Sequence, residues 1–350
     1  MLSPGVRPDQ RARLQYLTPG PGSKTAGRFR ATARADLRIL VPMQPTTSQS
    51  TVITTGRGWW WKTLVLGILL WAVTAAVTFS TQNSNLIPTV ILLGSFLVPF
   101  TVVLFVVEKA HGSIDIMLLL AAFFFGGIFG VLGASILESH LSPSVWIYVG
   151  VGAIEEAVKI AVFLVVGARV AHKTGLTGAL LGATVGAGFA AFESAGYAFN
   201  ASLTRLGQID LNSLLQTEAV RGLLTPVGHV LWTAILGAAI FGAASAAGRY
   251  RFTGGVLLAY LTVVALHALW DSMGFISAYL AIKVTGGVHY ELAYGQLLPA
   301  AADNASTWST VFYVVGLVVI SALGVLALRH WSRTGAQQVA PSAGTSPSTR

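Results

Sequence analysis

Residues 144–170 read SVWIYVGVGAIEEAVKIAVFLVVGARV, an apolar run that is interrupted in its interior by Glu155, Glu156 and Lys159. The run is long enough to cross a bilayer, which takes about 20 apolar residues in a helix. A charged side chain at the bilayer centre costs about 2.5–3.5 kcal/mol on insertion scales. The three charged residues must therefore face one another, water, a metal ion or other polar groups inside the protein.

The whole chain has the composition of a membrane protein. Only 10% of its 350 residues are charged and its mean hydropathy is +0.69, whereas a soluble domain carries about 25% charged residues. These values exclude a soluble globular domain, a disordered chain and a coiled coil. The chain has no cysteine, which excludes disulfides, cysteine nucleophiles, iron–sulfur clusters and thiolate zinc sites.

Eight apolar stretches are long enough to span a bilayer as helices. Their approximate limits are 62–79, 86–107, 114–137, 144–170, 174–199, 221–246, 254–281 and 307–328. We therefore expect an all-α polytopic membrane protein with about eight transmembrane helices. The expected parts are a disordered basic tail (1–58), three transmembrane helices (59–137), a four-helix core with the polar motifs (138–281), an outer loop and last transmembrane helix (282–330) and a disordered tail (331–350).

The basic residues predict the orientation of the chain and its surroundings. Lys and Arg exceed Asp and Glu by nine, and membrane proteins gather Lys and Arg in their cytoplasmic loops. With the N-terminus inside, 18 of the 22 Lys and Arg fall on the cytoplasmic side and Lys159 lies within a span. The three that fall outside are Arg205, Arg221 and Lys283. We expect a multi-pass protein of the cell membrane with both termini cytoplasmic, in contact with lipid and not with nucleic acid.

Four consecutive spans carry ionisable residues that do not belong in lipid. From the fourth span to the seventh they are Glu155, Glu156, Lys159, Glu193, His229, His267 and Asp271. Such residues inside a membrane are functional by default and face the interior of the helix bundle. Glu155 and Lys159 share one helix face, as do His267 and Asp271, because each pair is four residues apart. We expect all seven to converge on one site.

The residue types in this cluster suit hydrolysis. Four acids and one Lys leave a local charge of about −3, which a divalent cation or protons would relieve. Imidazole and carboxylate ligands suit zinc, and a metal-activated water beside a glutamate base is hydrolase chemistry. The sequence has no H-E-x-x-H motif of zincins and no G-x-S-x-G before a His partner. Asp271 is the single Asp deep in a span, so an aspartyl dyad lacks its second member.

The polar motifs, taken in order, resemble a known family. Glu155-Glu156-x-x-Lys159, then Phe189-x-x-x-Glu193, then His229 and then His267-x-x-x-Asp271 look like the motifs of the PrsW family of intramembrane proteases. That family is similar to type II CAAX prenyl endopeptidases and bacterial CPBP proteins. The resemblance covers about 144–281. It implies cleavage of membrane-anchored proteins, with anti-sigma factors as the known substrate type.

The resemblance also implies roles for the residues. The expected catalytic residues are Glu155, Glu156, His229 and His267. The expected supporting residues are Lys159, Glu193 and Asp271. Glu155 would act as general base toward a water, and Glu156 would pair with Lys159 or polarise that water. The two histidines would be metal ligands or oxyanion donors.

The resemblance leaves the metal open. Family members are often called metalloproteases, which implies zinc or another divalent cation. The expected ligands are Glu193, His229, His267 and Asp271, where Glu193 and Asp271 would complete the ligand set or orient the histidines. In the CAAX relatives the second motif ends in His, whereas this chain has Glu193 there. A glutamate mechanism without metal is therefore the close variant.

Two other classes of protein remain as alternatives. Intramembrane Glu, His and Asp chains also form relays, so a proton- or cation-coupled transporter is one, and an inverted repeat or broken helices would favour it. The other is a non-catalytic membrane scaffold that binds a partner's transmembrane helix. Besides these, Gly178, Gly182 and Gly186 recur at four-residue spacing, which predicts close packing of another helix against the fifth span.

Overall fold

The computed structural model of the chain describes residues 58–144, 146–285 and 299–337. Both predicted tails lie largely outside these residues, so their predicted disorder stays a prediction. The described elements are α1 (Trp59–Thr81), η1 (Ser84–Leu86), α2 (Ile87–Ala110), α3 (Ile116–Glu138), α4 (Ile147–Gly167), α5 (Gly175–Ala201), α6 (Leu211–Leu224), η2 (Thr225–Val227), α7 (His229–Gly242), α8 (Gly254–Val284) and α10 (Pro299–Gln337). In the described residues the only β contact is an isolated bridge between Leu203 and Ile209.

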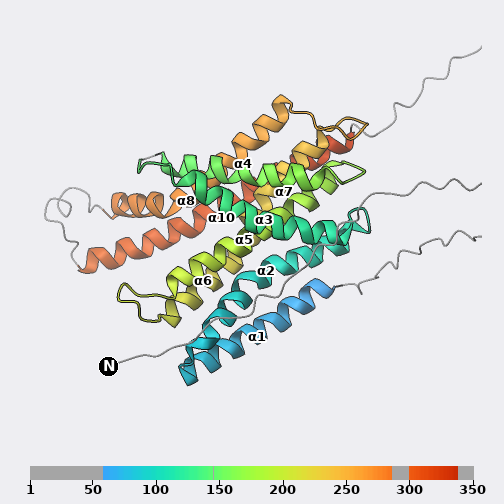
Figure 1. Ribbon diagram of the computed structural model, residues 1–350. Coiled ribbons are helices and arrows are strands. Elements are labelled where there is room, and N and C mark those ends of the chain that lie inside the picture. Colours follow the sequence, from blue (N-terminus) through green and yellow to red (C-terminus); the bar gives the residue numbers. More distant parts are fainter. Residues whose placement is uncertain (1–57, 145, 286–298, 338–350) are drawn as a thin grey trace, which may run out of the picture. The chain divides into compact units, whose positions relative to one another are not determined.

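All eight predicted stretches are helical (Figure 1). Among the described residues, seven helical segments are long and apolar enough to cross a membrane. The remaining stretch is α4, which has 21 residues but carries the buried charged residues Glu155, Glu156 and Lys159. Many large apolar side chains, such as Leu66, Leu69 and Val73 of α1, are exposed, which suits lipid and not water. The fold is that of an all-α polytopic membrane protein.

The predicted sixth span, 221–246, is wrong at its start and is not one helix. α6 begins at Leu211 because the Asp210 carboxylate accepts a hydrogen bond from the Ser213 N–H, at 3.0 Å, and caps the helix. The expected linker 200–220 is therefore partly helical. The backbone then changes to the short 3-10 helix η2, where Pro226 has no N–H to donate. His229 is the first residue of α7 and directly follows this break.

The last helix is longer than predicted at both ends. α8 continues to Val284 and α10 runs from Pro299 to Gln337, so the expected outer loop 282–306 is helical at each end. The expected disordered tail from 331 is helical as far as Gln337. Apolar length limits only the part of a helix that lies in lipid, and a helix can continue beyond it with polar residues. Residues 286–298 and 338–350 lie outside the described ones.

α5 and α7 form the centre of the helix bundle. In the apolar segment of α5, 83% of the residues are buried, against 17% in α1 and in α10. A Cβ on Gly182 would collide with the backbone carbonyl of Thr233 in α7, and Gly178 and Gly186 meet the α7 backbone in the same way. The predicted close-packing face is thus confirmed. It brings the start of α7 against the middle of α5, where the polar residues of both helices lie.

Replacing Gly182 with Leu is expected to prevent normal folding. Extra methylenes in a packed core cost about 1–3 kcal/mol, and here the clash is with backbone, which no rotamer change relieves. The protein should accumulate poorly in membranes and unfold at a lower temperature. Gly196→Leu on the same helix is the control, because its Cβ would have no heavy atom within 4 Å. Near-normal accumulation of the Gly182→Leu protein with lost cleavage would contradict this and move that face into the active site.

Candidate active site

The seven predicted residues come together on α4, α5, α7 and α8, with Lys159 at their centre. The Lys159 ammonium donates to Glu155 Oε2 at 3.0 Å and to Glu156 Oε1 at 2.8 Å. It also lies 2.8 Å from His229 Nδ1 and 3.9 Å from the ring centroid of Phe189. Lys159 and Glu156 have no exposed surface. One buried cation therefore joins both glutamates of α4 to the first residue of α7.

His229 is fixed by a partner on each ring nitrogen. An ammonium group only donates, so Nδ1 of His229 accepts the hydrogen bond from Lys159. The other nitrogen, Nε2, lies 2.9 Å from Glu193 Oε2 on α5 and carries the proton that this carboxylate accepts. The contacts thus assign His229 to the neutral tautomer that is protonated on Nε2.

His267 lies next to His229, with 5.2 Å between the two ring centroids, and contacts both glutamates of α4. Its Nδ1 lies 3.0 Å from Glu156 Oε1, and its Nε2 lies 3.4 Å from Asp271 Oδ2 and 3.7 Å from Glu155 Oε2. The indole of Trp232 stacks on the imidazole, with 4.4 Å between ring centroids. The contacts hold the imidazole of α8 between Glu156 of α4 and Trp232 of α7.

Arg221 is a site residue that the sequence analysis missed. It pairs with Glu193, donates to Ser194 Oγ at 2.9 Å and lies 4.1 Å from the ring centroid of Tyr197. The sequence places it among the cations outside the membrane, because the apolar stretch of the sixth span begins at 221. The signal that could have found it is the Asp210 cap, which starts a helix ten residues earlier.

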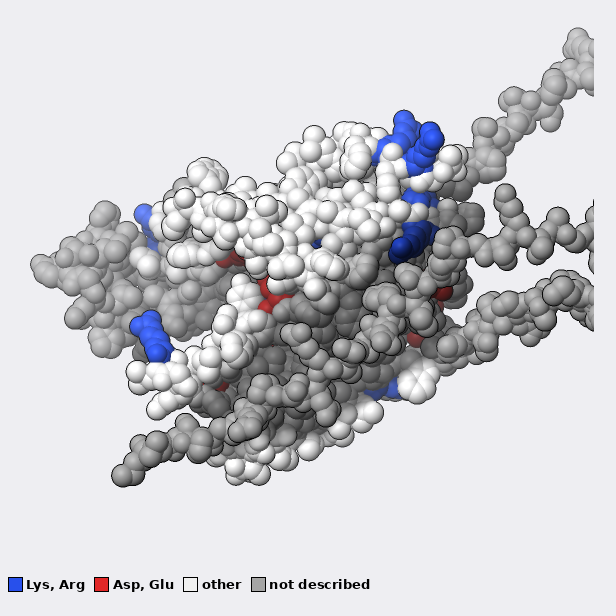
Figure 2. Space-filling model, in the orientation of Figure 1, with Lys and Arg blue, Asp and Glu red and all other residues white. Residues whose placement is uncertain are grey.

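A cavity of about 510 Å³ opens beside this cluster. It is lined by residues of six helices, among them Glu138, Tyr148, Glu155, Phe189, Glu193, Tyr197, Arg221, His229, Trp270 and Asp271. Glu156, Lys159 and His267 are not part of its wall. In Figure 2 acidic side chains show in a hollow of otherwise uncharged surface. The two glutamates of α4 therefore differ: Glu155 reaches open space and Glu156 is enclosed by protein.

The donors of the cluster fit a metal ion in type and spacing. Glu155, Glu156, His229 and His267 each offer one atom, and these atoms lie within 4.8 Å of one another. Two carboxylates and two imidazoles are ligands that zinc accepts. The Lys159 ammonium lies within 3.0 Å of three of these four residues. A divalent ion among all four therefore requires the ammonium to move away, because two cations repel at such distances.

The expected ligand set differs from this group in two members. The sequence predicts Glu193 and Asp271 either as ligands or as residues that orient the histidines, and the closely spaced group contains Glu155 and Glu156 in their place. Glu193 and Asp271 each lie against an Nε2 atom, of His229 and of His267 respectively. Carboxylates in such places commonly orient an imidazole.

Comparison with known proteins adds the family. Residues 115–298, just over half of the chain, match the family described as PrsW family intramembrane metalloprotease. The chain belongs to this family. Comparisons with curated proteins and with solved structures gave no significant match.

The family match begins at Asp115, the N-cap residue of α3, and includes all seven predicted residues and Arg221. α1 and α2 lie outside it. The predicted membership of the PrsW family is confirmed, and with it the class of enzyme: an intramembrane metalloprotease of a multi-pass membrane protein family.

Proposed function

We propose that this PrsW family protein hydrolyses a peptide bond of a membrane-anchored protein, with a water molecule activated by Glu155. One observation carries the proposal: Glu155 is the glutamate of the pair that lines the 510 Å³ cavity. Five further acidic or basic residues line the same wall: Glu138, Glu193, Arg221, His229 and Asp271. A water in this cavity would lie within reach of the Glu155 carboxylate. A general base in such a position contributes about 10²–10⁴ in rate.

Glu156 would have a different role from Glu155. It is fully buried and contacts Lys159 and His267. We assign it to hold these two side chains in place. Lys159 would in turn hold the Glu155 carboxylate at 3.0 Å and leave its other oxygen to face the cavity.

Of the two histidines, only His229 would face the substrate, and both would serve as ligands when a metal is bound. His229 lines the cavity, and His267 Nε2 lies 3.7 Å from Glu155 Oε2. Glu193 and Asp271 would orient them through the Nε2 atoms. Arg221 would fix Glu193 in turn.

The metal would be held by Glu155, Glu156, His229 and His267, and zinc fits this donor set. Bound there, it would supply a Lewis acid and an activated water. When no metal is bound, the Lys159 ammonium would supply the positive charge among Glu155, Glu156 and His229. A mechanism in which Glu155 activates water without a metal would then need no other cation in the cluster.

The test is cleavage by the purified protein in lipid vesicles. A panel of single-span reporter proteins, including one of anti-sigma-factor type, is incubated with the reconstituted enzyme. The expected result is a truncated reporter, and the metal content of the same sample is measured. Absence of product from every reporter, together with proton or cation flux into the vesicles, would instead favour a transporter.

One observation favours that second candidate. The junction of α6, η2 and α7 is a broken helix, a feature that transporters use to build ion sites and that the sequence did not reveal. In this protein the break places His229 at the first position of α7, against Lys159 and Glu193. The break therefore also serves the proposed protease site.

We also propose that both termini are cytoplasmic in the cell membrane, which the distribution of Lys and Arg favours. Tags inserted in 203–209 and in 286–298 should then be reached by a membrane-impermeant reagent from outside intact cells, and tags at either terminus should not. Labelling of the 286–298 tag from the cytoplasmic side only would reject this orientation.

A further inference from the structure

Glu218 of α6 is a buried acid that the proposed mechanism does not use. It is 3% exposed. Its Oε2 accepts a hydrogen bond from the indole N–H of Trp71 on α1, at 2.7 Å. Its Oε1 is buried and has no hydrogen-bond partner among the described residues. A buried carboxyl group with a single neutral donor is a poor source of stability.

The surface opposite Glu218 is shaped to receive it. A Cβ on Gly94 of α2 would overlap the Glu218 carboxyl group, so only glycine leaves the room that this group fills. Around it, Leu214 of α6 packs with residues of α2 and α5, and Trp71 borders the same cluster. The carboxyl group of Glu218 is therefore held between Trp71 of α1 and Gly94 of α2, and these two residues form its seat.

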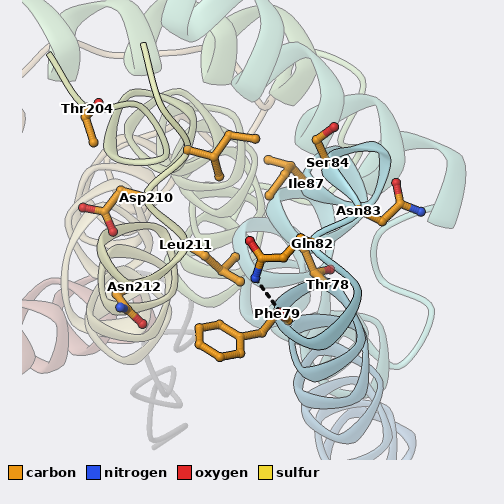
Figure 3. Close-up of a pocket in the computed structure, with 11 residues that line it drawn as sticks. Thr78, Phe79, Gln82, Asn83, Ser84, Ile87, Thr204, Asp210, Leu211 and Asn212 are labelled. Carbon is orange, nitrogen blue, oxygen red and sulfur yellow. Dashed lines mark hydrogen bonds between the residues drawn. The ribbon is translucent and has the colours of Figure 1, made fainter. Parts of the chain in front are cut away.

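A cavity separates α1 and α6 where α1 ends and α6 begins. Figure 3 shows a cavity between the end of α1 and the start of α6, with Gln82 on one side and Asp210 and Asn212 on the other. Its volume is about 260 Å³. The start of α6 is thus loosely packed on α1, and the directional contact between Glu218 and Trp71 lies further along the helix.

α6 connects this seat to the proposed active site. Arg221 lies three residues after Glu218, and it pairs with Glu193 and donates to Ser194 on α5. Glu193 accepts from His229. A rotation or shift of α6 would therefore move Arg221 relative to Glu193, and with it the partner that orients His229.

We propose that Glu218 is a positioning residue for the reaction: its seat against Trp71 and Gly94 sets the rotation of α6, which holds Arg221 on Glu193. The inference rests on the proposed function. Through the contacts of Glu218 with Trp71 and Gly94, helices α1 and α2 would contribute to the geometry of the catalytic cluster, although both lie outside the family match.

The first test is a double-mutant cycle on reporter cleavage. Glu218→Leu should lower kcat about tenfold, the lower end of the loss of about 10–100-fold seen for residues that support metal ligands from outside, with KM little changed. Glu218→Gln should restore most of the rate, because its amide oxygen still accepts from Trp71. With Arg221→Ala already present, Glu218→Leu should have no further effect on kcat. A merely structural residue would lower the rate equally in both backgrounds.

Two glycines give a matched pair of control variants. Gly94→Ala should reproduce the loss seen with Glu218→Leu, because its methyl group takes the seat of the carboxyl group. Gly222→Ala on α6 should cleave at the wild-type rate, because its Cβ would meet only Val98 at 3.7 Å, an ordinary contact. Wild-type kcat in the Glu218→Leu protein, or additive effects with Arg221→Ala, would overturn the proposal.

A second readout does not depend on cleavage. The chain has no cysteine, so Val220→Cys and Phe199→Cys, at exposed positions of α6 and α5, would carry the only two spin labels. Glu218→Leu should shift or broaden the distance distribution between the labels, and Gly222→Ala should not. An unchanged distribution would overturn the positioning role. If the wild-type protein cleaves no reporter, the proposed function fails, and this measurement still decides the role of Glu218 in placing α6.

Discussion

Glu155→Gln protein is expected to insert and fold as the wild type does and to lose reporter cleavage by about 10²–10⁴-fold. Gln keeps the shape of Glu and still accepts a hydrogen bond from Lys159, but it cannot take a proton from water. Because Glu155 lines the cavity, the loss should appear in kcat. The measurement is the amount of truncated reporter per amount of folded enzyme.

The other residues of the cluster provide graded comparisons. Glu156→Gln, His229→Ala and His267→Ala should also abolish cleavage. Glu193→Gln and Asp271→Asn should give intermediate losses if these carboxylates orient the histidines, and full losses if they bind a metal directly. Full cleavage by both the Glu155→Gln and the Glu156→Gln proteins would reject the protease mechanism and favour the scaffold.

Lys159→Met is expected to damage folding at least as much as cleavage. It leaves Glu155 and Glu156 without the cation that both contact, and breaking a buried ion pair from one side costs about 3–5 kcal/mol. Membrane accumulation and the temperature of thermal unfolding in detergent should both fall. Lys62→Met on the exposed face of α1 is the control and should have little effect.

Two further substitutions should reverse the loss of stability that is expected for the Lys159→Met protein. Adding Glu155→Gln and Glu156→Gln to Lys159→Met removes the stranded charges, and the stability should largely return, because exchanging a whole buried ion-pair group for neutral residues is often nearly neutral. Zinc should also raise the unfolding temperature of the Lys159→Met protein more than that of the wild type. A stable Lys159→Met protein that is inactive would instead make Lys159 a direct participant in catalysis.

Much of the architecture follows from local sequence. A run of apolar residues of sufficient length has to be helical in lipid, because only a helix satisfies its own backbone groups there. Ionisable residues inside such runs have to meet one another, because each is costly alone. This reasoning predicted the helices, the gathering of Glu155, Lys159, His229 and His267, and the packing face of α5. The family resemblance rested on the same residues.

What the sequence by itself determined is therefore which helices form and which of their residues must be inside. Only the tertiary structure decided how the helices are rotated and where the α6–α7 segment breaks. Those details separate Glu155 on the cavity wall from enclosed Glu156, put Lys159 among the metal donors, and bring Arg221 to Glu193. The physical reason is that the contacts between helices, Arg221 with Glu193 and Lys159 with His229, join residues 28 and 70 positions apart in the chain. Hydropathy and helical spacing report only on neighbours within one helix.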